Sequence, residues 1–192
     1  MLESQAAPLA RPHLHSGGFG RTAREIVETL VLVAIIYALV NLASARFVVD
    51  GPSMQPTFYT GQYLIVSRVN YLLSDPQRGN VVVFHYPGDP EQDYIKRVIG
   101  LPGDTVEIRA TQVYVDGRAL NEPYINEPCT PSTCRDNSWP LNADQFFMMG
   151  DNRNHSSDSR AFGPVERHFI VGRALVRYWP PQNWGIINGY SS

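Results

Sequence analysis

The sequence predicts a mainly β protein, with an N-terminal transmembrane helix followed by a β-rich soluble domain. Three observations lead to this fold class. A largely apolar run covers residues 26–45 of the 192-residue chain. After this run, apolar residues alternate with polar ones or form short groups between turn residues, and helical periodicity is nearly absent. Residues 104–142, rich in Pro, Asn and Cys loops, interrupt this pattern, and we interpret them as a smaller β subdomain inserted into the main sheet.

Composition limits the classes of protein to which the chain can belong. An apolar share of 43% supports a packed core and argues against disorder, and 192 residues allow one or two small domains. The formal net charge of -2 gives no indication of nucleic-acid binding.

The N-terminal part predicts a tail and a membrane anchor. Residues 1–25 are rich in Ala, Pro, Gly and His without a hydrophobic period, so we expect a disordered tail. As a helix, residues 26–45 would span about 30 Å, the thickness of a bilayer core. Arg21 and Arg24 precede this run and Arg46 follows it, which favours a cytoplasmic N-terminus. We expect a single-pass protein of the cell membrane, with residues 46–192 outside the cytoplasm.

A cleaved signal peptide is the alternative interpretation of the same run. The start is basic, the apolar centre covers Leu30 to Val40, and Ala43-Ser44-Ala45 is a small-residue triplet of the cleavage type. Both interpretations place the following residues on the far side of the membrane from the cytoplasm.

Short strands with turn residues between them account for most of the remaining chain. We predict a hairpin turn at Asp116-Gly117, between residues 112–115 and 118–120. The other predicted strands are Phe47–Val49, Tyr63–Val69, Val81–His85, Tyr94–Leu101, Thr105–Ile108, Phe146–Met149 and Ile170–Trp179.

Residues 50–58, Asp-Gly-Pro-Ser-Met-Gln-Pro-Thr-Phe, are the first candidate for chemistry. Pro52 and Pro56 fix the backbone on either side of Ser53, and Gly51 allows conformations that other residues avoid. A nucleophile needs such positioning. An ordinary Pro/Gly turn after a membrane anchor is the alternative.

A serine nucleophile needs a base, and Lys96 is the most informative candidate. His85, His155 and His168 stand in no pattern that recommends them, whereas Lys96 is the only lysine of the chain. On a strand it shares a face with Tyr94 and Val98, and burial among apolar neighbours would lower its pKa. A fall from about 10.4 to about 8 corresponds to roughly 3 kcal/mol. The alternative is a surface lysine on an edge strand.

Two further segments carry reactive groups. Residues 148–160 place many hydrogen-bonding side chains directly after an apolar strand, which is typical of functional loops and also of Asx turns. Cys129 and Cys134 lie in a short polar loop, and no His or further Cys is spaced to complete a zinc site with them. A local disulfide fits an oxidising compartment, and two reduced thiols are the alternative.

Three segments together resemble type I signal peptidases, the membrane-anchored Ser/Lys proteases of family S26 that remove signal peptides from exported proteins. They are Ser-Met-x-Pro-Thr from Ser53, Lys-Arg-Val-Ile-Gly-x-Pro-Gly-Asp from Lys96, and Gly-Asp-Asn-Arg from Gly150 with Ser-x-Asp-Ser-Arg from Ser156. The resemblance covers the anchor and nearly all of residues 46–178, in the family's order, which makes the combination highly specific.

The resemblance implies a role for each matching residue. Ser53 matches the nucleophile, Lys96 the general base, and Ser156 the serine that orients the lysine. The backbone N–H of Ser53 matches the oxyanion donor, whereas Gly51 replaces a hydroxyl residue that some members use as a second donor. Residues implied to support the site structurally are Asp151, Asn152, Arg153, Asp158 and Arg160. Some members also carry a disulfide in the inserted β domain, as Cys129 and Cys134 would.

The implied activity is endoproteolysis of exported preproteins after small residues, at sites of the Ala-x-Ala type. It proceeds through an acyl-enzyme and requires no metal or organic cofactor. Because Ser53 follows residue 45 by only eight positions, it lies within roughly 28 Å of the helix end, so we expect it to act close to membrane lipid.

A self-cleaving repressor-type Ser/Lys protease is a second enzyme that the sequence could encode, but the membrane anchor argues against it. A catalytically inactive anchored β module that binds exported peptides is the non-enzyme alternative.

Overall fold

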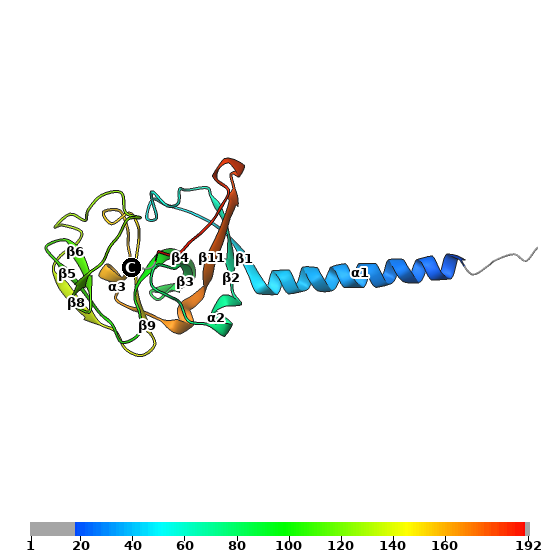
Figure 1. The fold of residues 1–192 in the computed structure, drawn as a ribbon, viewed down its shortest axis with the longest axis horizontal. Helices are drawn as coiled ribbons and strands as arrows, with labels where there is room; N and C mark the ends of the chain where they lie inside the picture. The colour runs from blue at the N-terminus through cyan, green and yellow to red at the C-terminus, as the bar shows by residue number, and fades with distance from the viewer. Residues whose placement is uncertain (1–17, 191–192) are drawn as a thin grey trace, which may run out of the picture. The chain divides into compact units, whose positions relative to one another are not determined.

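The computed structural model describes residues 18–190 and confirms the mainly β class with one N-terminal apolar helix (Figure 1). The chain divides into two compact units, residues 1–40 and residues 41–192. The first contains most of helix α1 (Gly18–Ala43), whose segment Gly20–Ala43 is long and apolar enough to cross a membrane. The second contains all the strands and both candidate catalytic residues.

The start of α1 corrects the predicted boundary between tail and anchor. The helix begins at Gly18, within the predicted tail of residues 1–25, and residues 1–17 lie outside the described part of the chain. Arg21 pairs with Glu25 and Arg24 with Glu28, one helical turn apart, and such pairs extend a helix through polar sequence. The helix ends at Ala43, because Ser44 already pairs with Ser67 as the first residue of a strand.

The main sheet contains eight strands, and every pairing within it is antiparallel. Its order is β1-β2-β11-β3-β4-β9-β10, with β12 paired to β11. The strands are β1 (Ser44–Val48), β2 (Tyr63–Ser67), β3 (Val81–Tyr86), β4 (Asp89–Gly100), β9 (Gln145–Met149), β10 (Val165–Glu166), β11 (Ile170–Trp179) and β12 (Gly185–Ile186). Strand β4, which carries Lys96, therefore lies inside the sheet between β3 and β9.

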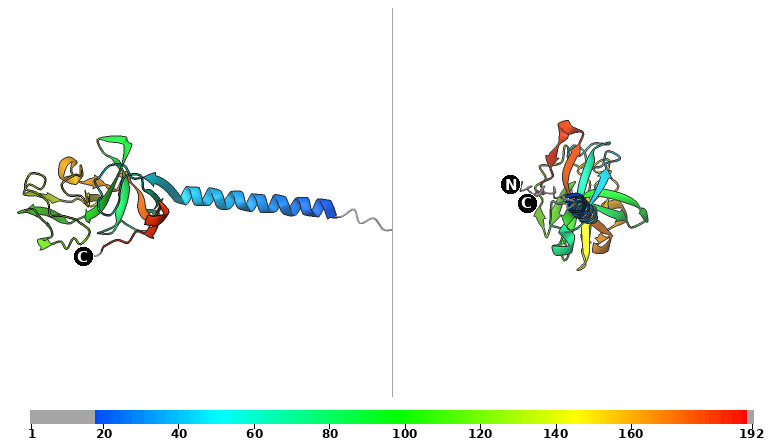
Figure 2. Two further views of the ribbon diagram at one scale, coloured as in Figure 1. Left: turned by 90° about the horizontal axis from the view of Figure 1, so that it is seen from above. Right: turned by 90° about the vertical axis from the view of Figure 1, so that its right-hand side faces the viewer.

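A second sheet of four strands is built entirely from residues within the stretch 104–142. Its order is β7-β6-β5-β8, with β5 (Thr105–Arg109), β6 (Gln112–Val115), β7 (Arg118–Ala119) and β8 (Asn137–Pro140). Asp116 and Gly117 have φ values of 50° and 75°, which is the conformation of a two-residue hairpin turn. The two sheets share one apolar core, in which Ile99, Phe147 and Met149 pack with Val106 and Ile108, and they lie side by side (Figure 2). The shared core supports the strands that border the candidate site.

The sequence patterns did not predict several of the short strands and helical turns. Strand β8 is mostly exposed and polar, and a two-residue strand such as β10 or β12 is too short to show a period. The single-turn helices α2 (Asn70–Leu73) and α3 (Ser159–Phe162) are too short for a 3.6-residue pattern, as are the 3-10 turns η1 (Arg167–Phe169) and η2 (Pro181–Asn183).

Candidate active site

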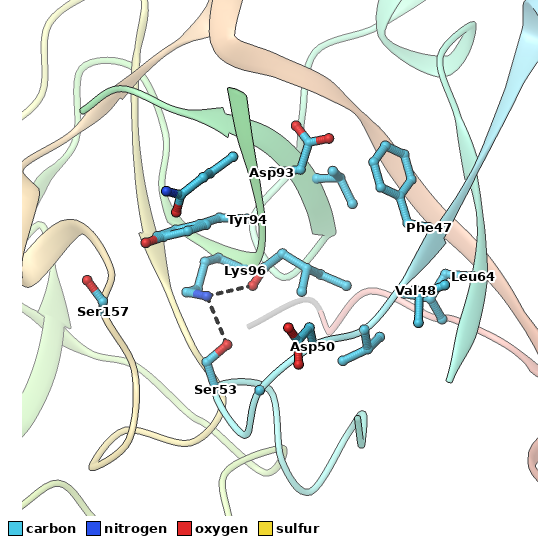
Figure 3. Close-up of a pocket in the computed structure, with 14 residues that line it drawn as sticks. Phe47, Val48, Asp50, Ser53, Leu64, Asp93, Tyr94, Lys96 and Ser157 are labelled. Atoms are coloured by element: carbon cyan, nitrogen blue, oxygen red, sulfur yellow. Dashed lines mark hydrogen bonds between the residues drawn. The ribbon is translucent and has the colours of Figure 1, made fainter. Parts of the chain in front are cut away.

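The side chains of Ser53 and Lys96 meet. Lys96 Nζ donates hydrogen bonds to Ser53 Oγ and to the carbonyl of Ile95, each at 2.9 Å (Figure 3). Ser53 lies in the loop after β1 and Lys96 in the centre of β4, so the fold brings together residues 43 positions apart. An amine at this distance can accept a proton from the hydroxyl when the amine is neutral.

Burial makes that neutral form accessible. Lys96 is only 4% exposed, and burial lowers its pKa to about 8, even though Asp158 and Asp151 act in the opposite direction. The Arg160 guanidinium adds a smaller lowering effect on this pKa. The centroid of the Tyr94 ring lies 5.1 Å from the amine, as expected for two residues that share one face of the strand.

The loop around Ser53 is held from both sides. Asn152 donates its backbone N–H to the Ser53 carbonyl at 3.0 Å and its side-chain amide to the Pro52 carbonyl at 3.2 Å. Met54 and Phe58 are fully buried in the core, so the residues next to Ser53 anchor the loop. The Ser53 backbone N–H donates to no other residue in the described chain. Gly51, with φ of 85°, contributes no hydroxyl beside it.

Asp151 joins the three sequence segments. Arg97 donates to its two oxygens at 2.7 and 2.6 Å, and Thr57 of the serine loop donates to the same carboxylate. The Arg97 and Asp151 side chains are 1% and 0% exposed. Arg97 and Thr57 were not predicted as site residues, although Arg97 follows Lys96 directly.

Asp158 and Arg160 form a second buried ion pair. Arg160 donates to both carboxylate oxygens at 2.8 and 2.7 Å, and Gly150 N–H donates to Asp158 at 2.9 Å. Burial alone would raise the pKa of Asp158, but the hydrogen bonds and charge of Arg160, with the Gly150 N–H, hold it below its usual value. The carboxylate is therefore ionised and fixes the start of α3, whose first turn it caps.

Arg153 reaches the irregular segment between β7 and β8, the outer strands of the second sheet. It donates to both oxygens of Glu122 and, through Nε, to the Gly150 carbonyl at 3.0 Å. The Tyr124 hydroxyl also donates to Glu122, and the Tyr124 ring lies 4.1 Å from the Arg97 guanidinium carbon. Glu122 and Tyr124 were not predicted as site residues, because they lie in an irregular Pro- and Asn-rich segment that is distant along the chain from Arg97 and Arg153.

Ser156 lies at the site without the predicted contact to Lys96. Its hydroxyl is buried and makes no hydrogen bond of acceptable geometry among the described residues, although it lies close enough to the Asp158 carboxylate to lower the pKa of that group slightly. The bond from Lys96 to the Ile95 carbonyl holds the amine instead. A Cβ at Gly150 would lie 2.3 Å from Ser156 Oγ and 2.4 Å from the Ser53 carbonyl oxygen, so only glycine allows these groups to approach there.

A cleft of about 410 Å³ opens beside Ser53 and Lys96. Its walls include the apolar side chains of Phe47, Leu64 and Ile95, and the carboxylates of Asp50 and Asp93 (Figure 3). A lining of this kind can bind a mainly apolar group next to the hydroxyl.

Cys129 and Cys134 form a disulfide, with their Cα atoms 5.8 Å apart. Arg160 Nη1 contacts both sulfur atoms, at 3.3 and 3.1 Å, so the disulfide lies against the arginine that pairs with Asp158. Within residues 18–190, no group of three or more His, Cys, Asp or Glu side chains is placed to hold a metal ion.

Known proteins have sequences similar to that of this chain over most of its length. The family described as "Signal peptidase, peptidase S26" matches residues 23–179. Signal peptidase I of Leptolyngbya laminosa is 40% identical over 190 residues, covering 93% of this chain and 90% of that protein. The probable signal peptidase I-2 of Synechocystis sp. is 37% identical over 171 residues, covering 85% of this chain and 76% of the relative. A solved structure of a signal peptidase I from Enterococcus faecalis has 32% identity and a TM-score of 0.46, covering 52% of this chain and 97% of that one.

Proposed function

The chain belongs to the signal peptidase family, peptidase S26, and on that premise we propose that it is a signal peptidase I with a Ser53/Lys96 dyad. Its reaction is the removal of N-terminal signal peptides from exported preproteins. The observation that carries the proposal is the 2.9 Å contact between the Ser53 hydroxyl and a lysine amine that is only 4% exposed. A buried amine next to a hydroxyl is the arrangement that general-base activation of serine requires.

Each step of the proposed reaction moves one proton through Lys96. Neutral Nζ takes the proton of Ser53 as Oγ attacks the scissile carbonyl carbon, and the Ser53 N–H stabilises the oxyanion of the tetrahedral intermediate. The Lys96 ammonium then protonates the leaving amine, which is the new N-terminus of the mature protein, and an acyl-enzyme remains. Water gives a proton to Lys96 as it attacks this ester. When the second intermediate collapses, Lys96 returns the proton to Ser53.

The proposed cleavage site has small side chains of the Ala-x-Ala type. The cleft of about 410 Å³ runs beside Ser53, and the apolar side chains of Phe47 and Ile95 favour small apolar groups over charged ones. In the proposal α1 is a retained anchor, the N-terminus is cytoplasmic, and lipid lies close to the site. The membrane then delivers the apolar part of the signal peptide to the same side as the hydroxyl.

Processing of a preprotein by the full chain in lipid vesicles tests the dyad. We expect Ser53→Ala and Lys96→Ala each to abolish cleavage, with near-wild-type circular dichroism and thermal unfolding. Normal processing by either variant would refute the dyad. If the wild-type chain binds the preprotein without cleaving it, the chain is instead the inactive peptide-binding module considered above.

A further inference from the structure

The segment 187–190, which we call the strap, returns from β12 toward the start of β3 (Figure 1). At its first residue, Ile187 donates its N–H to the Leu175 carbonyl at 2.8 Å and packs against the core. Further along, a Cβ at Gly79 would lie 1.7 Å from the Tyr190 carbonyl oxygen, and one at Gly189 would lie 2.8 Å from Asn80 Nδ2. At Gly79 backbone therefore lies directly on backbone, which requires glycine there, whereas a side chain at Gly189 would first meet the Asn80 side-chain amide.

The aromatic ring at the end of the strap covers a buried cation. The ring centroids of Tyr190 and Tyr124 are 5.3 Å apart, and the Arg97 guanidinium carbon lies 5.2 Å from Tyr190 and 4.1 Å from Tyr124. Arg97 is 1% exposed, whereas Tyr190 is 46% exposed. Tyr190 is therefore the outer layer between this guanidinium and water, and its π face attracts the cation.

The guanidinium that Tyr190 covers, that of Arg97, connects separate segments of the site. Arg97 donates to Asp151 through Nε and Nη2 and to the Gly79 carbonyl through Nη1, at 2.8 Å. The strap thus contacts both the guanidinium and the residue that accepts its remaining bond. Because charges attract more strongly where water is excluded, admitting water at Tyr190 would weaken the pair that links β4 to the serine loop.

We propose that Tyr190 is a positioning residue, which acts on Ser53 and Lys96 by sealing the Arg97–Asp151 ion pair against solvent. The predicted effect of Tyr190 on activity rests on the proposed function, whereas its predicted effect on the structure does not. The inference assigns a role to a segment that contains none of the family's sequence motifs.

Removal of the Tyr190 ring should change the electrostatic environment of Lys96. The charged groups that act on Lys96 are Asp158, Asp151 and Arg160. If Arg97 moves toward solvent, the Asp151 charge is less neutralised and stabilises the Lys96 ammonium. Water that follows the arginine would act in the same direction by reducing the desolvation of the amine. The acid limb of the pH–rate profile should therefore move to higher pH.

The test compares Tyr190→Ala, Tyr190→Phe and Trp184→Ala in the full chain, with a preprotein substrate in vesicles. Trp184 is a matched control, since it is an exposed aromatic residue of the same C-terminal region, outside the strap. We expect Tyr190→Ala to lower kcat about tenfold, equivalent to about 1.4 kcal/mol, with KM changed less than about twofold. Its acid limb should shift upward. Tyr190→Phe, which keeps the ring, and Trp184→Ala should behave like wild type.

An unchanged kcat and acid limb in Tyr190→Ala would overturn the inference, as would an equal loss in Tyr190→Phe. If Tyr190→Ala does not fold, Tyr190→Val replaces it, because valine packs against the strap but is too small to cover the guanidinium, and the same fall in kcat and shift of the acid limb are expected.

Hydrogen exchange measured in the Ser53→Ala variant tests the structural role of Tyr190 without requiring an active enzyme. We expect Tyr190→Ala to speed exchange at the amides of Gly79 and Asn152, which donate to Val98 and to residue 53. Unchanged protection would overturn the inference. Absence of Ser53-dependent processing in the wild type would instead contradict the proposed function.

Discussion

Arg97 and Asp151 form a bidentate ion pair that is almost completely removed from water, with side chains 1% and 0% exposed. Arg97 follows Lys96 on β4, and Asp151 follows β9 in the loop that also binds Ser53 through Asn152. Since Thr57 donates to the same carboxylate, one ion pair connects the strand of the proposed base with the loop of the proposed nucleophile.

Removing one partner of this pair should cost more than removing both. Arg97→Ala would leave Asp151 buried and unpaired, and we expect the free energy of unfolding to fall by about 3–5 kcal/mol. The double variant Arg97→Met with Asp151→Leu should lose clearly less, because it buries no charge. Chemical unfolding of the full chain in detergent measures both, and equal losses would contradict this account of the pair.

Ser156→Ala should separate activity from stability. A buried hydroxyl without a well-formed hydrogen bond costs about 1–3 kcal/mol, which outweighs its slight effect on Asp158, so its removal should leave the unfolding temperature unchanged or raise it. If the hydroxyl orients Lys96, as the family resemblance implies, kcat should fall by about 10- to 100-fold. The measurement pairs thermal unfolding with preprotein processing. Wild-type kcat would exclude the orienting role.

The sequence predicts the parts of the fold in which pattern and burial coincide. Strands β2, β3 and β11 show short apolar runs or alternation, and Asp116-Gly117 is a local turn signal that needs no distant partner. Lys96 could be identified because no other lysine competes with it and because its strand neighbours predict a lowered pKa.

The missing parts depend on partners that are distant along the chain. Glu122 meets Arg153 across 31 positions, and Tyr190 meets Arg97 from a segment that contains no motif. The start of α1 was missed because its first turns are polar and are stabilised by ion pairs, which do not appear in a search for apolar runs. The predicted contact of Ser156 with Lys96 required side-chain directions that a motif does not contain.

Loss of the disulfide should affect stability first and activity second. For a loop this short, the chain-entropy contribution is roughly 2 kcal/mol, so Cys129→Ala with Cys134→Ala should lower the unfolding temperature. Activity should fall less than about threefold, because Asp158 and the Arg153 carbonyl still hold Arg160 at 2.7 and 2.8 Å. Thermal unfolding with and without reductant checks the first part. Identical unfolding of the reduced and oxidised wild type would contradict it.

The pH dependence of processing should report the titration of Lys96. Burial lowers its pKa to about 8, and only the neutral amine can accept the Ser53 proton, so kcat/KM should rise with pH and level off above about pH 8. Lys96→Arg keeps a positive charge at every accessible pH and should be inactive throughout. A profile that is flat between pH 6 and pH 9 would argue against Lys96 as the base.

The same lowered pKa predicts that the proposed base destabilises the fold. Because the folded pKa of about 8 lies below the value of 10.5 for an exposed lysine, the unfolded chain binds more protons between these values. The free energy of unfolding should therefore rise with pH through this window, and below about pH 8 the cost of burying the ammonium is fully present, at roughly 3 kcal/mol.

Lys96→Met tests this account, because it keeps about the same side-chain length without the charge. The variant loses two hydrogen bonds, worth about 1–2 kcal/mol together, so it should be about 1–2 kcal/mol more stable at pH 7 and show no rise in stability from pH 8 to 10.5. Chemical unfolding across this range, with Ser53→Ala as the control that keeps the amine, measures the difference. A variant that is less stable than wild type at pH 7, or that keeps the wild-type slope, would show that Lys96 is not buried as an ammonium.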